Sequence, residues 1–336
     1  MGKITGKVIM LLGGVLLLAA AAALATPPAQ KALPEDLFSV TFPDEQHGWA
    51  CGRFGVVLHT ADAGRTWVRQ ETGIDYTLSS ISFPDEHNGW AVGSEGTILH
   101  TADGGRTWVK QACPVQYYLM GVHFATPKEG WVVTERTTIL HTTDAGKTWQ
   151  VQFSDMDYIL KGVSFADAKN GWAVGEYGYV YKTADGATWT KQAGHFGISD
   201  ETGEIVAGNY LFGVFAESPT TAWAVGIDSY VTKTEDGGKT WKVLTLPIPK
   251  VNLYAVASKK GLVAICGEGL FILSRDGGST WSSPVFTPQI RYGWLYGVAP
   301  RGPGFVTVGW EGAVYEGSQT FVSRGRENYA TNDTAR

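Results

Sequence analysis

Residues 89–111 read GWAVGSEGTILHTADGGRTWVKQ, and this unit recurs along the whole chain. The first tryptophan of the unit, in the sequence Gly-Trp or Ala-Trp, marks five copies, at Trp49, Trp90, Trp131, Trp172 and Trp223. Eroded copies surround Ala264 and Val306, and about ten extra residues separate the fourth copy from the fifth. The spacing is otherwise about 41 residues, and a period of 40 to 45 residues is typical of a four-stranded propeller blade. Seven copies therefore predict a seven-bladed β-propeller.

Each unit divides into four short strands of β-branched and aromatic residues, separated by Gly, Pro, Asp or Asn. In the unit quoted, the second, third and fourth strands are expected at 89–92, 97–100 and 107–110. The first strands are expected to begin near Phe38, Ser80, Gly121, Gly162, Gly213, Tyr254 and Gly297. We therefore predict an all-β fold over residues 38–324, a seven-bladed β-propeller of four-stranded antiparallel blades.

The turn between the third and fourth strands carries a motif of its own, which reads TADAGRTW over residues 60–67. Its aspartate is present in six units, as Asp62, Asp103, Asp144, Asp185, Asp236 and Asp276. Such a carboxylate can accept hydrogen bonds from backbone N–H groups of its own turn, while the tryptophan that follows packs on the sheet. Each turn offers a single carboxylate, whereas a calcium loop needs several oxygen ligands. We therefore assign these aspartates a structural role and expect no metal.

Residues 1–25 have the features of an export signal. Two lysines precede an apolar run over residues 8–25, which ends in Ala-Leu-Ala, a small-residue cleavage pattern. The same run is long enough to act as an uncleaved membrane anchor. We expect an extracytoplasmic protein, periplasmic or, in a photosynthetic host, in the thylakoid lumen, and only this segment should contact a membrane. A leader over 26–37 and a polar tail over 325–336 should flank the propeller.

The charge of the chain argues against a nucleic-acid partner. The net charge is −5, and the sequence has no basic stripe that could neutralise phosphates. His59, His100 and His141 occupy the same position in three successive blades, too far apart to bind one ion. We expect a monomer without cofactor or metal.

The complete unit, as in residues 42–67 and again in 83–108, resembles the photosystem II stability/assembly factor family and its bacterial relatives. The resemblance covers about residues 38–324. It implies an exported, non-catalytic propeller that binds a protein subunit of a membrane-associated complex and assists its assembly or stability. Photosynthetic members use an arginine-rich patch on one face, and the arginines of this chain are too sparse to assign one.

The aspartate motif is also similar to the Asp-box, or BNR repeat, of sialidases, so a carbohydrate-binding or sialidase-like glycosidase propeller is the alternative. That family adds a Phe/Tyr-Arg-Ile-Pro signature, an arginine triad and a Tyr nucleophile paired with Glu. The signature is missing from the sequence, and the arginines outside the Asp-boxes are scattered. We assign no catalytic residue.

In a propeller, the turns between second and third strands share one face with the connections between blades, opposite the Asp-boxes. We call this the top face, and loops of this kind usually carry function. The turns bear an acid in six blades, Glu95, Glu135, Glu176, Asp228, Glu268 and Glu311. These are either ordinary turn residues or an acidic collar that attracts a basic segment. The insertion at 194–209, with Asp200, Glu201 and Glu204, should add an acidic loop to this face.

Aromatic and arginine side chains gather on the top face where the last blade meets the first. Of the thirteen tryptophans, only two lie outside the Asp-boxes and second strands, and both belong to the seventh unit. The set comprises Arg53, Phe54, Arg291, Tyr292, Trp294 and Trp310. Trp, Tyr and Arg are the residues enriched in binding hot spots. These side chains either bind the partner or seal the junction between the first and last blades.

Overall fold

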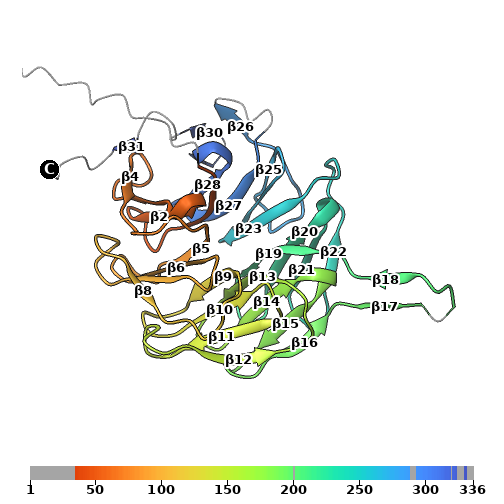
Figure 1. Cartoon of the computed structure of the whole chain (residues 1–336). Coiled ribbons are helices and arrows are strands. Elements are labelled where there is room, and N and C mark those ends of the chain that lie inside the picture. Colours follow the sequence, from red (N-terminus) through yellow and green to blue (C-terminus); the bar gives the residue numbers. More distant parts are fainter. Residues whose placement is uncertain (1–34, 200, 288–292, 319, 324–328, 331–336) are drawn as a thin grey trace, which may run out of the picture.

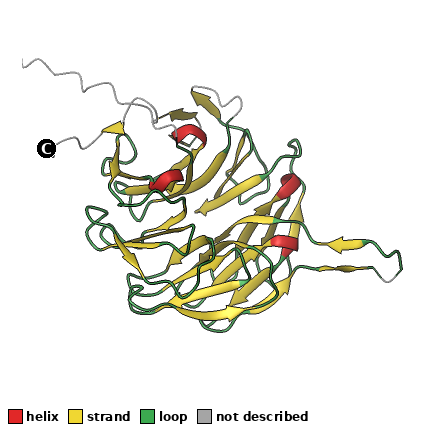
Figure 2. Cartoon of the chain, in the orientation of Figure 1, coloured by secondary structure: helices red, strands yellow, loops and turns green. Residues whose placement is uncertain are grey.

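A computed structural model describes residues 35–199, 201–287, 293–318, 320–323 and 329–330, and it confirms the predicted all-β propeller. Seven sheets surround a central axis, and the short helices within the described ranges are 3₁₀ turns (Figures 1 and 2). Among these residues, no helix has the length and apolar character needed to cross a bilayer. The predicted signal lies outside the described residues.

The first strand of every blade begins at a leucine, one or two residues earlier than predicted. Blades 1 to 4 comprise β1 (Leu37–Thr41), β2 (Gly48–Gly52), β3 (Val57–Thr60), β4 (Trp67–Gln70); β5 (Leu78–Ser82), β6 (Gly89–Gly93), β7 (Ile98–Thr101), β8 (Val109–Gln111); β9 (Leu119–Phe124), β10 (Gly130–Thr134), β11 (Thr138–Thr142), β12 (Gln150–Ser154); and β13 (Leu160–Phe165), β14 (Gly171–Gly175), β15 (Val180–Thr183), β16 (Thr190–Ala193). Blades 5 to 7 comprise β19 (Leu211–Ala216), β20 (Ala222–Gly226), β21 (Val231–Thr234), β22 (Lys242–Leu244); β23 (Leu253–Lys259), β24 (Leu262–Gly267), β25 (Leu270–Ser274); and β27 (Leu295–Arg301), β28 (Gly304–Gly309), β29 (Val314–Gly317), β30 (Thr320–Ser323).

Blade 6 departs from the four-stranded pattern. Its fourth strand is reduced to one bridge, in which Leu273 and Ser282 exchange two hydrogen bonds of 2.9 Å. Pro284 follows and has no N–H with which to continue the ladder. The chain then forms β26 (Val285–Thr287), which pairs in parallel with β30 at the outer edge of blade 7. The last short strand, β31 (Tyr329–Ala330), pairs in parallel with β4 and so joins the end of the chain to blade 1.

The first four blades are joined by stacked aromatic pairs. Trp49 of blade 1 lies nearly parallel to Phe83 of blade 2, with ring centroids 3.8 Å apart, and His59 stacks on Trp49 at 4.5 Å. The pair recurs between the following blades as Trp90–Phe124 and Trp131–Phe165. All three tryptophans are fully buried. Burial of such large side chains is a main source of stability in the ring.

A glutamine at the end of the fourth strand adds a polar link between blades. Gln111 Nε2 donates to the carbonyl oxygen of Ala145 at 2.8 Å, and its Oε1 accepts from Trp149 Nε1 at 3.2 Å. Both partners belong to the Asp-box of the next blade. Three other blades use the same donor in the same way, through Gln70, Gln152 and Gln192. One side chain thereby satisfies two polar groups that would otherwise be buried unpaired.

The six Asp-box carboxylates form hydrogen bonds within their own turns. Asp236 Oδ1 accepts from the backbone N–H of Thr240 at 2.9 Å, and Oδ2 accepts from the Thr240 hydroxyl at 2.7 Å. These bonds lower the pKa of Asp236 to about 2, and the equivalent bonds from Thr280 lower the pKa of Asp276 to about 2. In each case the hydrogen bonds favour the charged carboxylate, so the ionised form stabilises the turn.

Replacing Gln111 by Leu should remove the polar link between blades 2 and 3. The substitution leaves the indole N–H of Trp149 and the Ala145 carbonyl without their partner, so we expect a loss of about 1–3 kcal/mol of unfolding free energy. Urea unfolding followed by tryptophan fluorescence measures the change. Gln116→Leu, at an exposed glutamine of the same region, is the matched control. Equal losses in both variants would contradict the role assigned to Gln111.

The Asp-boxes should make stability depend on pH below about pH 4. A carboxyl group whose pKa is lower in the folded state contributes stability above its unfolded pKa of about 3.9, and this stability is lost as the pH falls toward 2. In the Asp236→Asn/Asp276→Asn variant the neutral amides no longer titrate, so the urea midpoint should fall less between pH 4 and pH 2 than in the wild type. An unchanged pH dependence would show that these turns do not contribute.

Candidate binding face

The top-face turns are fixed to the entrances of the first strands. In blade 1, the backbone N–H of Arg53 donates to the Asp36 carbonyl at 2.9 Å, and in blade 7 that of Trp310 donates to the Trp294 carbonyl at 2.8 Å. Equivalent bonds occur in the other five blades. The side chain that follows, such as Phe54 at φ 56°, then lies in the left-handed region, which non-glycine residues seldom occupy. Five of the seven turns share this strained conformation, at Phe54, Glu95, Tyr177, Asp228 and Glu311.

The six predicted acids all lie in these turns. Glu95, Glu135 and Asp228 are exposed, whereas Glu176, Glu268 and Glu311 are half-buried. Two of the carboxylates support their own blades: Glu135 Oε1 accepts from the N–H of Tyr118, and Glu176 Oε2 accepts from the N–H of Ile159, both at 3.0 Å. Those two acids thus have a turn-stabilising role. The collar remains a prediction.

One side chain from each blade closes the central channel at the top face. Each is the residue after the leucine that begins the first strand: Phe38, Ser79, Met120, Lys161, Phe212, Tyr254 and Tyr296. Together with Tyr118 they line a cavity of about 300 Å³, which we call the mouth cavity. Four of the seven are aromatic. In the sequence, each of these residues directly follows the leucine that recurs at the start of the first strand. From the sequence alone, we did not identify this position as part of a site.

The aromatic rings of the mouth cavity contact one another in series. Tyr296 lies 5.2 Å from Phe38 and 5.3 Å from Tyr254, and Tyr254 lies 5.8 Å from Phe212, measured between ring centroids. Burial raises the pKa of Tyr296 to about 12, so its hydroxyl stays protonated. Burial also lowers the pKa of Lys161, against the opposing effect of Glu176. The cavity therefore offers aromatic walls beside a single ammonium group.

Three exposed aromatic side chains come from the turns and connections near the mouth cavity. Phe54, Trp294 and Trp310 are 57%, 43% and 44% exposed. Trp294 lies 6.3 Å from Tyr254 and 6.1 Å from Tyr296, so it extends the aromatic series outward. The predicted Arg291 and Tyr292 lie outside the described residues. Exposed tryptophans of this kind are available to a partner rather than buried in the blade junction.

Asp36 connects blade 7 to blade 1. Its Oδ2 forms an ion pair with Arg53 at 3.0 Å, and its Oδ1 accepts from the backbone N–H of Glu311 at 2.9 Å. The carboxylate is almost buried between the two turns. Arg53, for which two roles were open, thus takes part in closing the ring. Sequence reasoning missed Asp36 because it precedes the first repeat.

The insertion forms a hairpin, not the acidic loop that was expected. Strands β17 (Phe196–Ile198) and β18 (Ile205–Ala207) pair with each other and project from the ring as an arm (Figure 1). Glu201 and Glu204 lie near its outer end, and Asp200 falls outside the described residues. Alternating apolar residues on both sides of the turn explain why strands form here.

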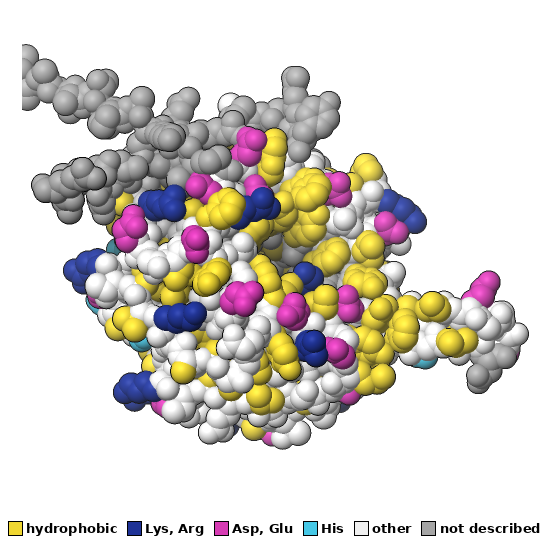
Figure 3. All heavy atoms as spheres, viewed as in Figure 1, with side chains coloured by type: hydrophobic (Ala, Val, Ile, Leu, Met, Phe, Trp, Pro, Cys, Tyr) yellow, Lys and Arg dark blue, Asp and Glu magenta, His cyan; other side chains and the backbone are white. Residues whose placement is uncertain are grey.

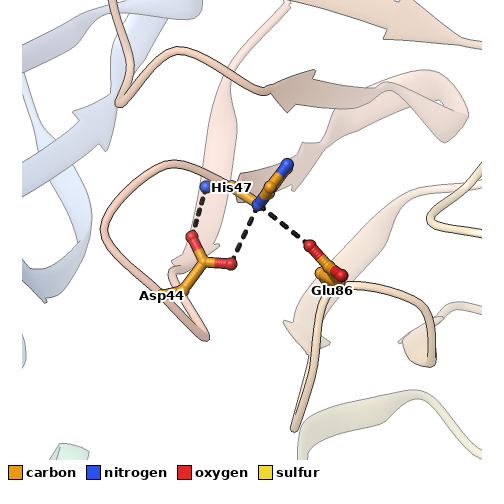
Figure 4. Close-up of side chains that lie close together, drawn as sticks. All are labelled: Asp44, His47 and Glu86. Carbon is orange, nitrogen blue, oxygen red and sulfur yellow. Dashed lines mark hydrogen bonds and ion pairs between the residues drawn. The ribbon is translucent and has the colours of Figure 1, made fainter.

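Among the described residues, one group of possible metal ligands occurs, and it lies on the opposite face. His47 Nδ1 lies 2.8 Å from Asp44 Oδ2 and 3.4 Å from Glu86 Oε2 (Figure 4). In blade 2, Asn88 takes the place of His47 and donates to Asp85. The bond from His47 to Asp44 is therefore the turn bond of the repeat, and it uses the nitrogen that would have to bind an ion. We assign this group a structural role.

The three repeated histidines are separated, each within its own blade. Each stacks on the second-strand tryptophan of that blade, at 4.5 Å for His59, 4.5 Å for His100 and 4.9 Å for His141. Burial lowers the pKa of His59 to about 4, so it is neutral at physiological pH. These side chains form part of the packing between blades.

The described carboxyl groups whose pKa values are displaced are all displaced downward. They lie in the Asp-boxes and in neighbouring turns of the face opposite the mouth cavity. A glycosidase needs a general acid with a raised pKa, paired with a second carboxylate. None of these displaced groups meets that requirement.

The comparisons with known proteins agree with the architecture. Three overlapping stretches, residues 28–112, 66–156 and 107–194, match the family described as photosynthesis system II assembly factor YCF48. A search of curated proteins found no match. A solved structure of YCF48 bound to D1 peptide superimposes with a TM-score of 0.68 at 21% identity, covering 85% of this chain and 94% of that one.

Two further structures show how widely the fold is shared. YCF48 from Cyanidioschyzon merolae gives a TM-score of 0.66 at 19% identity, covering 85% of this chain and 95% of that chain. The GH74 xyloglucanase from Xanthomonas campestris gives 0.71 at 13% identity, covering 89% of this chain and 55% of that one. At such identities the structural likeness establishes the fold alone.

Substitution of Asp36 should weaken the junction between the last and first blades. Asp36→Ala removes the acceptor of two hydrogen-bonding groups from different blades, so we expect a loss of about 1–3 kcal/mol in unfolding free energy. Asp157→Ala removes an exposed ion pair with Arg136 and is the matched control, with an expected loss below about 1 kcal/mol. Urea unfolding compares the two, and equal losses would show that Asp36 does not close the ring.

Proposed function

This chain is a photosystem II assembly factor-like seven-bladed propeller, and on that premise we propose that it is a non-catalytic scaffold that binds a protein partner. The partner we infer is a subunit of a membrane-associated complex, whose assembly or stability the propeller assists. The observation that carries the proposal is the aromatic mouth cavity, together with the exposed Trp294, Trp310 and Phe54 of the top-face turns and connections.

The chemistry of this region suits a segment of polypeptide. Aromatic side chains bury large areas at low entropic cost and dominate the binding energy of protein interfaces. A cavity of about 300 Å³ is at the lower end of the range for small-molecule sites, so it can receive one or two side chains of a longer ligand. The rest of that ligand would lie across Trp294 and Trp310.

The charges of the top face favour a basic segment. Glu95, Glu135 and Asp228 are exposed in its turns, and the whole chain carries a net charge of −5. Such a surface raises the rate at which a positively charged partner associates, and the effect weakens as salt is added. The YCF48 structure with a D1 peptide supports binding of a protein segment by a propeller of this kind.

We also propose that the propeller works outside the cytoplasm. The support is the signal-like segment over residues 1–25, with its lysines, apolar run and small-residue cleavage pattern. Such a location would give the top face access to the exported parts of a membrane complex.

A crosslinked pull-down from native membranes tests the proposal. The wild type should recover a discrete membrane complex, and Trp294→Ala/Trp310→Ala should lose it, because the variant removes both exposed indoles beside the mouth cavity. Val109→Ala/Val151→Ala, on the outer strands β8 and β12, is the matched control because both valines are at least half exposed. This control should recover the same complex as the wild type.

Two results would count against the proposal. If the wild type recovers no membrane protein, the scaffold function is wrong. If both variants recover the complex as well as the wild type does, the protein binds a partner by another surface.

A further inference from the structure

The arm has one face made entirely of apolar side chains. In its register, Ile198 lies opposite Ile205 and Phe196 lies opposite Ala207. Residues directly opposite each other in an antiparallel pair, and residues two apart along a strand, point to the same side. These four side chains therefore form one surface, which we call the arm face. Ile198 and Ile205 are 71% and 69% exposed.

The base of the arm is fixed to the top face. The Phe196 ring lies 4.5 Å from Tyr177 and 5.9 Å from Tyr158, between centroids. The backbone N–H of His195 donates to the Tyr177 carbonyl at 3.1 Å, and a side chain at Gly208 would collide with that same carbonyl. Close packing at this point positions the arm instead of letting it pivot. The arm face thus continues the aromatic surface of blade 4.

Figure 3 shows this continuity from outside. Hydrophobic side chains gather around the middle of the molecule and extend onto the projecting hairpin. The ring contacts follow the same course, because Tyr177 also lies 5.2 Å from Tyr210 in the connection to blade 5. The arm face and the proposed binding surface are therefore parts of one region.

An uncovered apolar face on a two-stranded hairpin needs an explanation. An isolated hairpin of two strands is marginally stable in water, and contiguous exposed apolar surface usually marks an interaction site. In the free protein, Ile198 and Ile205 keep most of their surface in contact with water. Covering them would stabilise both the arm and the complex.

The negative charge of the arm indicates which kind of molecule can bind to the arm face. Residues 194–209 contain Asp200, Glu201 and Glu204 but no Lys or Arg. Near the base, the charge of Asp157 is offset by Arg136, whose Nη1 lies 3.6 Å from its Oδ2. Like charges disfavour the arm of a second copy and the surface of an anionic membrane, whereas a segment that combines apolar and basic residues is complementary.

We propose that the arm face docks an extended segment of the protein partner in which apolar residues alternate with Lys or Arg. This inference rests on the proposed function. The apolar side chains, two residues apart, would cover Ile198, Ile205 and Phe196. The basic ones would lie on the outer side of the segment, where the negative charge of Glu201 and Glu204 attracts them over a longer range. The arm would then set which partner segments can reach the mouth cavity.

Binding of a defined peptide tests this inference. The probe is a fluorescein-labelled, amidated octapeptide of alternating Lys and Val, titrated with the full-length protein and followed by fluorescence anisotropy. Ile198→Ser/Ile205→Ser should raise the Kd at least tenfold, because it removes the centre of the arm face. Val206→Ser is the matched control, since Val206 lies on the other face of the hairpin and is 45% exposed. Its Kd should stay within twofold of the wild type.

The substituted residues are exposed, so the variants should fold, and equal thermal unfolding midpoints establish this. Three outcomes would overturn the inference: equal Kd values for both variants, equal binding of an alternating Glu and Val peptide, or a wild-type dimer in sedimentation that the isoleucine variant abolishes. Failure here is separate from failure of the proposed function. If Trp294→Ala/Trp310→Ala loses the membrane complex while the arm variant retains both peptide and complex, only the arm is excluded.

Discussion

The ring depends on the contacts between neighbouring blades, which in blades 1 to 4 centre on a second-strand tryptophan stacked on a phenylalanine at the end of the next blade's first strand. A single blade exposes apolar surface on both faces and cannot bury it alone, so stability comes from neighbours. Trp49 on Phe83 is the first of these pairs, and Gln70 joins the same two blades through a hydrogen bond to Gly104. Because these contacts lie within the sheets and the Asp-box turns, the loops of the top face can vary without disturbing them.

The stacked pair does not occur at the junction where the ring closes, and other interactions join blade 7 to blade 1 there. Blade 7 has Val306 in place of the tryptophan, and the core there is shared between Val306, Val308 and residues of blade 1 such as Leu37 and Trp67. Asp36 adds a polar link, and β31 adds a strand to the outer edge of β4. An apolar core, one carboxylate and one added strand thus hold the last blade to the first.

The difference between contacts that recur in each blade and contacts that occur only at the junction explains what the sequence could predict. Blade number, strand positions and the turns around Asp62 depend on local chemistry that recurs in each unit, so periodicity and motif spacing indicate them directly. The Asp36 link depends on the junction between blades 7 and 1, which only the closed ring brings together. The arm was expected as a loop, although the alternation of Phe196 with Ile198, and of Ile205 with Ala207, was a usable strand signal. The mouth cavity could not be predicted from the sequence, because its lining comes from all seven blades and forms only in the closed ring.

The two faces of the molecule therefore differ in kind. One carries the Asp-boxes, where repeated hydrogen bonds satisfy the turns and leave little freedom for change. On the other, Phe54, Glu95 and Glu311 adopt positive φ angles that cost conformational energy. A turn with glycine at those positions would avoid the cost, so the side chains retained there must contribute something that glycine cannot. Phe54 and Glu95 are exposed, so packing does not explain why these turns hold such side chains in a fixed direction.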